Sequence, residues 1–176
     1  MRKYDVLVVG GGTSGCAAAY TAGKLGLKTL LIEKGIHLGG AITSGLVVPV
    51  MKSGDNQINT EFYNNLISEL KNYGGQVTYQ DNPGWFNPEL TKIVLDKMMQ
   101  DANVEVLFGA YPISAKIDSS YINHVEINNQ LLSVSNDTIY TNKNTSKNTK
   151  ILSEYIEAKY VVDATGNCEF SKLINC

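Results

Sequence analysis

The stretch "DVLVVGGGTSGCAAA", residues 5–19, decides the fold. Its apolar run, Val6–Val9, is typical of a buried strand in a parallel sheet. Glycines follow, and the small residues after them predict a helix over residues 14–26. A second apolar run at residues 28–32 ends at Glu33. The order strand, helix, strand within about 30 residues predicts a βαβ unit.

The glycines of this unit form the pattern G-x-G-x-x-G at Gly10, Gly12 and Gly15. The first permits a tight turn, the second lets a pyrophosphate approach the backbone, and the third lets the helix pack close to the sheet. The N-terminus of the helix offers unpaired N–H groups and a partial positive charge to phosphates. This context predicts a dinucleotide-binding site, with a purely structural glycine turn as the alternative.

Glu33 follows Gly10 by 23 residues, where a carboxylate can accept hydrogen bonds from ribose hydroxyls. The same carboxylate would repel a 2′-phosphate, so NADP is disfavoured. NAD and FAD both present a free ribose diol, and this residue does not separate them.

The composition narrows the class of protein. The chain has 176 residues, 43% of them hydrophobic, which favours one folded domain. Its net charge is −2 and it has no long basic run, so nucleic acid is not an expected partner. The cysteines at 16, 168 and 176 form no C-x-x-C pair. They predict neither a disulfide framework nor a four-thiolate metal site, and we expect a reducing cytoplasm.

A secretion signal is the other interpretation of the N-terminus, because Arg2 and Lys3 precede an apolar run. That run, Val6–Val9, has only four residues before Gly10, whereas a signal needs roughly 7–15. No segment approaches the roughly 18 apolar residues of a membrane span. We therefore expect a chain with neither a signal nor a membrane span.

Further elements follow along the chain. Helical periodicity over residues 59–73 predicts a buried stripe at Phe62, Leu66, Ile67, Leu70 and Tyr73. A second helix starts at Asn87 as N-cap with Pro88 after it, and its expected stripe is Leu90, Ile93, Val94 and Met98. A short strand is expected at 104–108, and antiparallel strands at 111–118, 121–128 and 130–136. The last strand ends in "DATGN", residues 163–167.

Several residues are not expected to act chemically. His37 is expected in a solvated loop and His124 inside a strand, while Trp85 and Phe86 are expected to pack as apolar residues or as a hydrophobic staple. The polar segment at residues 141–150 is expected to be a hairpin tip. The sequence supports no catalytic nucleophile, general base or metal cluster.

Four segments in order carry a family resemblance: "VVGGGTSGCAAA" with Glu33, "LGGAITSG", "FNPELTKIVLDKMMQDANVEVLFGA" and "YVVDATGN". With these the chain resembles the N-terminal part of FAD-dependent oxidoreductases of the two-dinucleotide-fold type, and more narrowly heterodisulfide-reductase-subunit-A-like flavoproteins. The resemblance implies an α/β, Rossmann-like FAD-binding domain. Its parallel sheet would carry helices and an inserted antiparallel β-meander.

The resemblance also implies which residues contact FAD. The pyrophosphate would face Gly10, Gly12, Thr13, Ser14 and Gly15, with Glu33 and Lys34 at the adenosine ribose. The remaining implied contacts are Gly40, Thr43, Ser44 and Gly45 toward the flavin, Ala110 and Tyr111 beside the adenine, and Ala164, Thr165 and Gly166 in the second motif. An acidic residue often follows that last glycine in the family, whereas Asn167 stands here.

Family members typically continue with a substrate domain and a late Gly-Asp motif, a role that Gly54-Asp55 does not fill. The resemblance therefore implies that residues 1–176 are an incomplete FAD-binding domain that holds the ADP moiety and is a poor catalyst alone. Implied partners are FAD, a redox substrate or electron-transfer partner, and either a complementary chain segment or another copy. The alternatives are a non-catalytic module that binds an adenine dinucleotide, and an NAD-dependent dehydrogenase.

Overall fold

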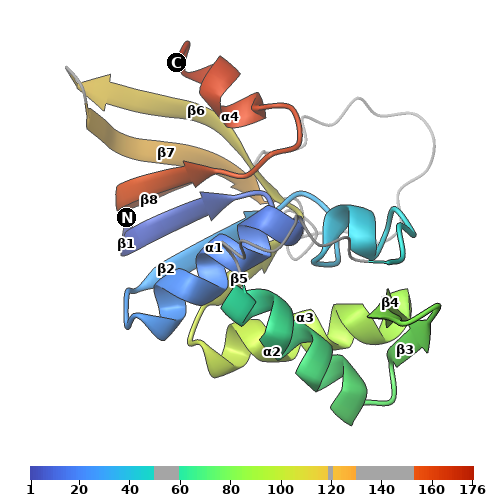
Figure 1. The fold of residues 1–176 in the computed structure, drawn as a ribbon. Coiled ribbons are helices and arrows are strands. Elements are labelled where there is room, and N and C mark those ends of the chain that lie inside the picture. Colours follow the sequence, from blue (N-terminus) through green and yellow to red (C-terminus); the bar gives the residue numbers. More distant parts are fainter. Residues whose placement is uncertain (50–59, 119–120, 130–152) are drawn as a thin grey trace, which may run out of the picture.

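The computed structural model describes residues 1–49, 60–118, 121–129 and 153–176. They are organised by a six-stranded sheet, shown in Figure 1. Its strands, in chain order, are β1 (Arg2–Val9), β2 (Thr29–Glu33), β5 (Glu105–Phe108), β6 (Ala110–Asp118), β7 (Tyr121–Asn129) and β8 (Ser153–Asp163). Across the sheet they lie in the order β5-β2-β1-β8-β7-β6.

The sheet has a parallel half and an antiparallel half. β1 pairs in parallel with β2 and β8, and β2 pairs in parallel with β5. β7 pairs antiparallel with both β6 and β8. In the parallel half Val9 pairs with Ile32 on one side and with Asp163 on the other, so three strands end at the same level. The expected parallel sheet with an antiparallel meander is confirmed.

Helices cover one face of the parallel half (Figure 1). These are α1 (Thr13–Lys24), α2 (Thr60–Asn72) and α3 (Pro88–Asp101), and their apolar side chains share a core with Val8 and Leu31 of the sheet. The neighbouring residues Leu7 and Leu30 point to the opposite face, as successive strand residues must. There they pack with β7 and with Phe170 of the short helix α4 (Glu169–Leu173). The sheet is therefore buried on both faces around β1 and β2.

A small hairpin, β3 (Gln76–Tyr79) and β4 (Asn82–Phe86), was not expected from the sequence. Phe86 is buried in the core and Trp85 meets the Tyr79 ring edge-on at 5.3 Å, so both pack as strand residues. A staple is ruled out, because the residue four positions into α3 is Thr91.

Two positions expected in the helical stripes are exposed. Tyr73 is 44% exposed because α2 ends before it, and Ile93 is 53% exposed on the outer side of α3. The Gly54-Asp55 pair, the strand expected at 130–136 and the hairpin tip expected at 141–150 lie outside the described residues.

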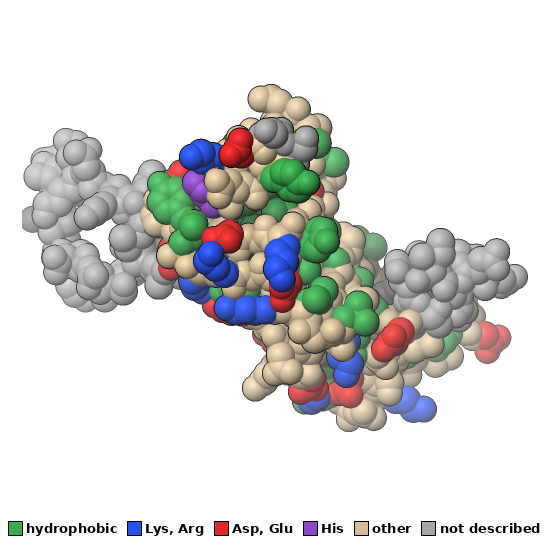
Figure 2. Space-filling view, turned by 90° about the vertical axis from the view of Figure 1, so that its left-hand side faces the viewer, with side chains coloured by type: hydrophobic (Ala, Val, Ile, Leu, Met, Phe, Trp, Pro, Cys, Tyr) green, Lys and Arg blue, Asp and Glu red, His purple; other side chains and the backbone are tan. Residues whose placement is uncertain are grey.

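Figure 2 shows one side of the molecule, on which basic and acidic side chains lie close together. Ion pairs between neighbouring strands include Lys3–Glu157 at 2.9 Å and Lys159–Asp5 at 2.6 Å. This side therefore presents no extended surface of one charge. Within the described ranges, no helix is long and apolar enough to cross a membrane.

Candidate dinucleotide-binding site

A cleft of about 540 Å³ lies where β1, β2 and β8 end and α1 begins. We call it the carboxyl-edge cleft. In an α/β sheet, ligands bind at this edge of the parallel strands. The cleft is lined by Val9, Gly10, Gly12, Thr13, Ser14, Ile32, Glu33, Lys34, Gly40, Ala41, Ala110, Tyr111, Pro112, Ala164, Thr165, Gly166, Asn167 and Glu169.

The glycines of the turn between β1 and α1 have different surroundings. Gly10 has φ +100°, and a Cβ there would lie 2.9 Å from the carbonyl oxygen of Ala164. A Cβ on Gly15 would lie 1.8 Å from the carbonyl oxygen of Gly10, so Gly15 serves close packing and does not line the cleft. At Gly12, by contrast, no heavy atom of the described residues other than Gly12 and its two chain neighbours lies within 4 Å of where a Cβ would be. The absence of a side chain at Gly12 leaves the cleft floor open.

The N-terminus of α1 opens into this space. Its N-cap is Gly12, which has no side chain to cap the helix, and its first turn carries no acidic residue. Thr13 and Ser14, the first residues of α1, line the cleft. The first N–H groups of a helix have no partner within it and attract anions together with the helix dipole. The arrangement is suited to a phosphate or pyrophosphate.

Glu33, at the end of β2, faces the same turn. One carboxylate oxygen accepts a hydrogen bond from the N–H of Gly11 at 2.6 Å, and the other accepts one from Gly35 at 2.6 Å. The carboxylate therefore links two backbone segments that border the cleft. A carboxylate can accept about four hydrogen bonds, so it keeps capacity for a ligand hydroxyl.

The loop around Gly40 packs against the glycine turn. Gly39 donates its N–H to the carbonyl oxygen of Gly11 at 2.8 Å, and Thr13 Oγ1 donates to the carbonyl oxygen of Gly39 at 3.3 Å. These contacts place Gly40 in the cleft lining. Within this loop, Gly40–Ile42 form a short 3₁₀ helix.

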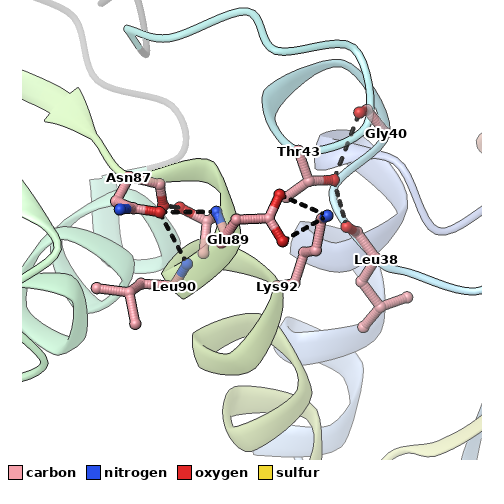
Figure 3. A network of polar contacts seen from close by, with 8 residues as sticks. Leu38, Gly40, Thr43, Asn87, Glu89, Leu90 and Lys92 are labelled. Carbon is pink, nitrogen blue, oxygen red and sulfur yellow. Dashed lines mark hydrogen bonds and ion pairs between the residues drawn. The ribbon is translucent and has the colours of Figure 1, made fainter.

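Three predicted site residues of this loop do not line the cleft in the described part of the chain: Thr43, Ser44 and Gly45. Thr43 is fully buried, and its hydroxyl donates to the carbonyl oxygens of Leu38 and Gly40 (Figure 3). Its side chain thus holds the loop that carries Gly40 and is turned toward that loop's own backbone.

The opposite wall comes from the start of β6. Gly109 donates its N–H to the carbonyl oxygen of Gly35 at 3.0 Å, which brings Ala110 and Tyr111 beside the end of β2. The buried amide of Asn128 donates to the hydroxyl of Tyr111 at 2.9 Å and fixes that side chain. Lys34 Nζ lies 5.8 Å from the centre of the Tyr111 ring.

The third wall follows β8. One carboxylate oxygen of Asp163 accepts hydrogen bonds from the N–H of Thr165 at 3.0 Å and from its hydroxyl at 2.6 Å. The other accepts from the N–H of Ser171 at 2.8 Å and from its hydroxyl at 2.7 Å. Burial works against ionisation of this group, but the bonds from Thr165 and Ser171 outweigh it and hold the pKa of Asp163 below its ordinary value.

Sequence reasoning missed the lining residues Val9, Ile32, Ala41, Pro112 and Glu169, and noted Asn167 only as a departure from a family pattern. Ala41 and Pro112 adjoin predicted residues and carry no chemical signal of their own. Asp163 was visible beside the ATG motif, but its bonds to Ser171, eight residues away, become evident only in three dimensions. Among the described residues there is no group of three metal-ligating side chains.

Comparison of sequences finds relatives for part of the chain. A stretch of 76 residues is 41% identical to digeranylgeranylglycerophospholipid reductase of Thermoplasma acidophilum, covering 42% of this chain and 19% of that protein. A stretch of 44 residues is 48% identical to thiamine thiazole synthase of Saccharolobus islandicus, covering 25% of this chain and 16% of that protein. The matched part thus spans less than a fifth of either relative.

Comparison of structures covers nearly the whole chain. THI4 of Thermovibrio ammonificans matches with a TM-score of 0.62 at 21% identity, over 99% of this chain and 64% of that one. The p-nitrophenol 4-monooxygenase PnpA of Pseudomonas putida matches with a TM-score of 0.66 at 16% identity, over 99% of this chain and 44% of that one. At these identities the likeness shows the fold.

The family is shown by a match over almost the full length. Residues 5–175 match the family described as FAD dependent oxidoreductase. This match decides in favour of FAD, which Glu33 alone did not separate from NAD. The narrower resemblance to heterodisulfide-reductase-subunit-A-like proteins stays a prediction. The chain belongs to the FAD-dependent oxidoreductase family, whose cofactor is FAD.

Proposed function

We propose that residues 1–176 are the portion of a flavin-dependent oxidoreductase that holds the ADP moiety of FAD in the carboxyl-edge cleft. The observation that carries this proposal is the open space at Gly12, directly in front of the uncapped N-terminus of α1. A diphosphate placed there would meet backbone N–H groups, with no side chain in its path. The residues present therefore fit the ADP half of FAD.

The roles proposed for the other residues follow from their positions around the cleft. Glu33 and Lys34 stand where the adenosine ribose would lie, and Tyr111 forms the wall beyond them. The remaining predicted contacts divide into two sets. Contacts with the cofactor are proposed for Gly10, Gly12, Thr13, Ser14, Gly40, Ala110, Ala164, Thr165 and Gly166, and support of the cleft for Gly15, Thr43, Ser44 and Gly45.

Bound FAD supplies the redox chemistry, and the residues described here bind and orient it. The redox substrate or electron-transfer partner is proposed to meet the flavin outside the ADP pocket. A non-catalytic module that only binds the dinucleotide is the alternative. Reduction of the FAD-loaded chain by a specific donor would separate the two.

The direct test of the cofactor site is Gly12→Ala. Its φ of −68° suits alanine, and the added methyl group enters open space, so folding is preserved. We expect the free energy of unfolding to change by less than about 1 kcal/mol, the scale of N-cap preferences. The methyl group would occupy the path of the pyrophosphate, and we expect FAD affinity to fall at least tenfold. Flavin fluorescence quenching measures the affinity.

The matched control is Lys24→Ala, at the other end of the same helix and outside the cleft lining. It should leave FAD affinity unchanged. The nucleotide released on denaturing the FAD-loaded wild type should be FAD by chromatography. Equal FAD affinities of Gly12→Ala and wild type would place the cofactor elsewhere.

We further propose a reducing, cytoplasmic location. The chain's three cysteines are free, and Cys168 and Cys176 are exposed. Exposed free thiols persist where the surroundings keep them reduced. A fractionation of the source cells that finds the protein in an oxidising compartment would contradict this.

A further inference from the structure

We propose that Asp163 is a positioning residue that holds one wall of the cofactor cleft in place without touching the cofactor. The wall consists of residues 164–167 together with the start of α4. The proposal rests on the proposed function, since it concerns the same cleft. It extends the proposed function by giving a role to Asp163, which does not itself line that cleft.

The sheet fixes the chain only as far as Ala164. The last pair of the β1–β8 register joins Val9 to Asp163, and one further hydrogen bond runs from the N–H of Ala164 to the carbonyl oxygen of Val9 at 2.9 Å. Thr165 and the residues after it have left the sheet. Their positions must come from other contacts.

The carboxylate of Asp163 supplies those contacts on both sides of the wall. One oxygen holds Thr165 through its N–H and its hydroxyl, and the other holds Ser171 in α4 in the same two ways. Of the four charge-assisted hydrogen bonds to this single side chain, two hold Thr165 and two join the end of β8 to α4. Such bonds are stronger and more directional than neutral ones.

Thr165 connects the hydrogen bonds of Asp163 to residues that line the cleft. Its hydroxyl, held by Asp163, accepts a hydrogen bond from the N–H of Glu169 at 2.7 Å. Between them Cys168 adopts φ +57°, a conformation that side chains rarely adopt and that the surrounding bonds must maintain. Asn167 and Glu169, on either side of Cys168, both line the cleft. The wall therefore depends on Asp163 for its shape.

Asparagine in place of Asp163 has nearly the same shape but only one acceptor oxygen. Its amide N–H₂ would face a donor at either Thr165 or Ser171, so half of the network is lost. We expect Asp163→Asn to raise the FAD dissociation constant at least tenfold. Hydrogen exchange of the ligand-free protein should increase in residues 164–176 and stay unchanged in β1.

The control is Asp101→Asn, which removes an exposed carboxylate paired with Lys97 on α3, outside the cleft lining. It should change neither FAD affinity nor exchange in residues 164–176. A second pair of variants tests the mechanism through Thr165. Because Thr165 also lines the cleft, this pair is compared by hydrogen exchange of the ligand-free protein: Thr165→Ser keeps the hydroxyl and should exchange as wild type in residues 166–176, whereas Thr165→Val loses it and should exchange faster there.

A folded Asp163→Asn variant that binds FAD as wild type does would overturn the proposal, and so would an exchange increase spread evenly over the protein. If Asp163→Asn does not fold, the Thr165 pair decides, and equal exchange of residues 166–176 in ligand-free Thr165→Ser and Thr165→Val overturns it. Failure of the wild type to bind FAD would instead refute the proposed function.

Discussion

The carboxylate of Glu33 accepts a hydrogen bond from the N–H of Gly11 at 2.6 Å, and so joins the end of β2 to the turn between β1 and α1. Its second oxygen holds Gly35 in the same way. An acidic residue at this place therefore shapes the glycine turn before any ligand arrives. It also keeps lone pairs that ribose hydroxyls can use.

Replacing Glu33 should weaken binding of the adenosine half of the cofactor. We expect Glu33→Ala to reduce ADP affinity by about 1–3 kcal/mol, the scale for hydrogen bonds to a charged group. This corresponds to a rise of roughly 5- to 150-fold in Kd. Calorimetric titration with ADP measures the effect without the flavin half.

Glu33→Gln keeps one acceptor oxygen, so its ADP affinity should lie between those of wild type and Glu33→Ala. Glu61→Ala, an exposed carboxylate on α2, is the control and should bind ADP normally. ADP affinity that is insensitive to all changes at Glu33 would remove this residue from the ribose site.

Gly10 and Gly12 should respond differently to the same substitution. Alanine at Gly10 would have to adopt φ +100° with its Cβ 2.9 Å from a backbone oxygen of Ala164. We expect Gly10→Ala to lower the free energy of unfolding by about 1–3 kcal/mol, the scale of local backbone strain. Urea unfolding followed by the fluorescence of the single tryptophan, Trp85, measures it.

The comparison with Gly12→Ala tests the division of roles. That variant should remain nearly as stable as wild type while losing FAD affinity. If both variants lose stability equally, Gly12 serves the packing of the turn as Gly10 does, and the proposed division of roles is wrong.

The glycine turn was predictable because its signals are local. The spacing of Gly10, Gly12 and Gly15, the apolar strand before them and Glu33 after them all lie within one βαβ unit. The N-cap at Asn87 was predictable for the same reason, since a cap involves only the next few residues.

Features that depend on distant contacts were not predictable. The β3–β4 hairpin is short and contains Pro83 and Gly84, which disfavour a strand in sequence patterns. Thr43 carries a hydroxyl suited to a ligand, yet burial turns it toward the backbone of its own loop. The role inferred for Asp163 requires the chain to return to it at Ser171.

The N-cap of α3 gives a separate test of stability. Asn87 Oδ1 accepts hydrogen bonds from the N–H groups of Glu89 at 2.9 Å and Leu90 at 3.2 Å (Figure 3). We expect Asn87→Ala to lower the free energy of unfolding by about 1 kcal/mol. Asn87→Asp keeps the acceptor and adds a favourable charge at the helix N-terminus, so it should be at least as stable as wild type. Equal free energies of unfolding for Asn87→Ala and Asn87→Asp in urea would contradict the capping role.

Cys16 should make the protein sensitive to alkaline pH. Its side chain is fully buried in α1, where its thiol donates to the carbonyl oxygen of Gly11 at 3.3 Å. Burial raises the pKa of Cys16 from its ordinary value of 9.0 to about 12. In the unfolded chain the thiol ionises near its ordinary pKa, whereas in the folded protein it stays protonated.

The folded state therefore loses stability as the pH rises above about 9, because only the unfolded state releases this proton there. The contribution is intact below pH 9, and we expect a loss of roughly 1–2 kcal/mol at pH 10 from this group.

Urea unfolding of wild type and Cys16→Ala at pH 7, 8, 9 and 10 isolates the contribution of the Cys16 thiol. The variant should be less stable than wild type at pH 7 because it leaves a small cavity, but its stability should fall less steeply between pH 9 and 10. Other groups that titrate in this range, including Tyr4, whose pKa burial raises to about 12, are common to both proteins. Parallel pH profiles would show that Cys16 ionises in the folded state as readily as in the unfolded one.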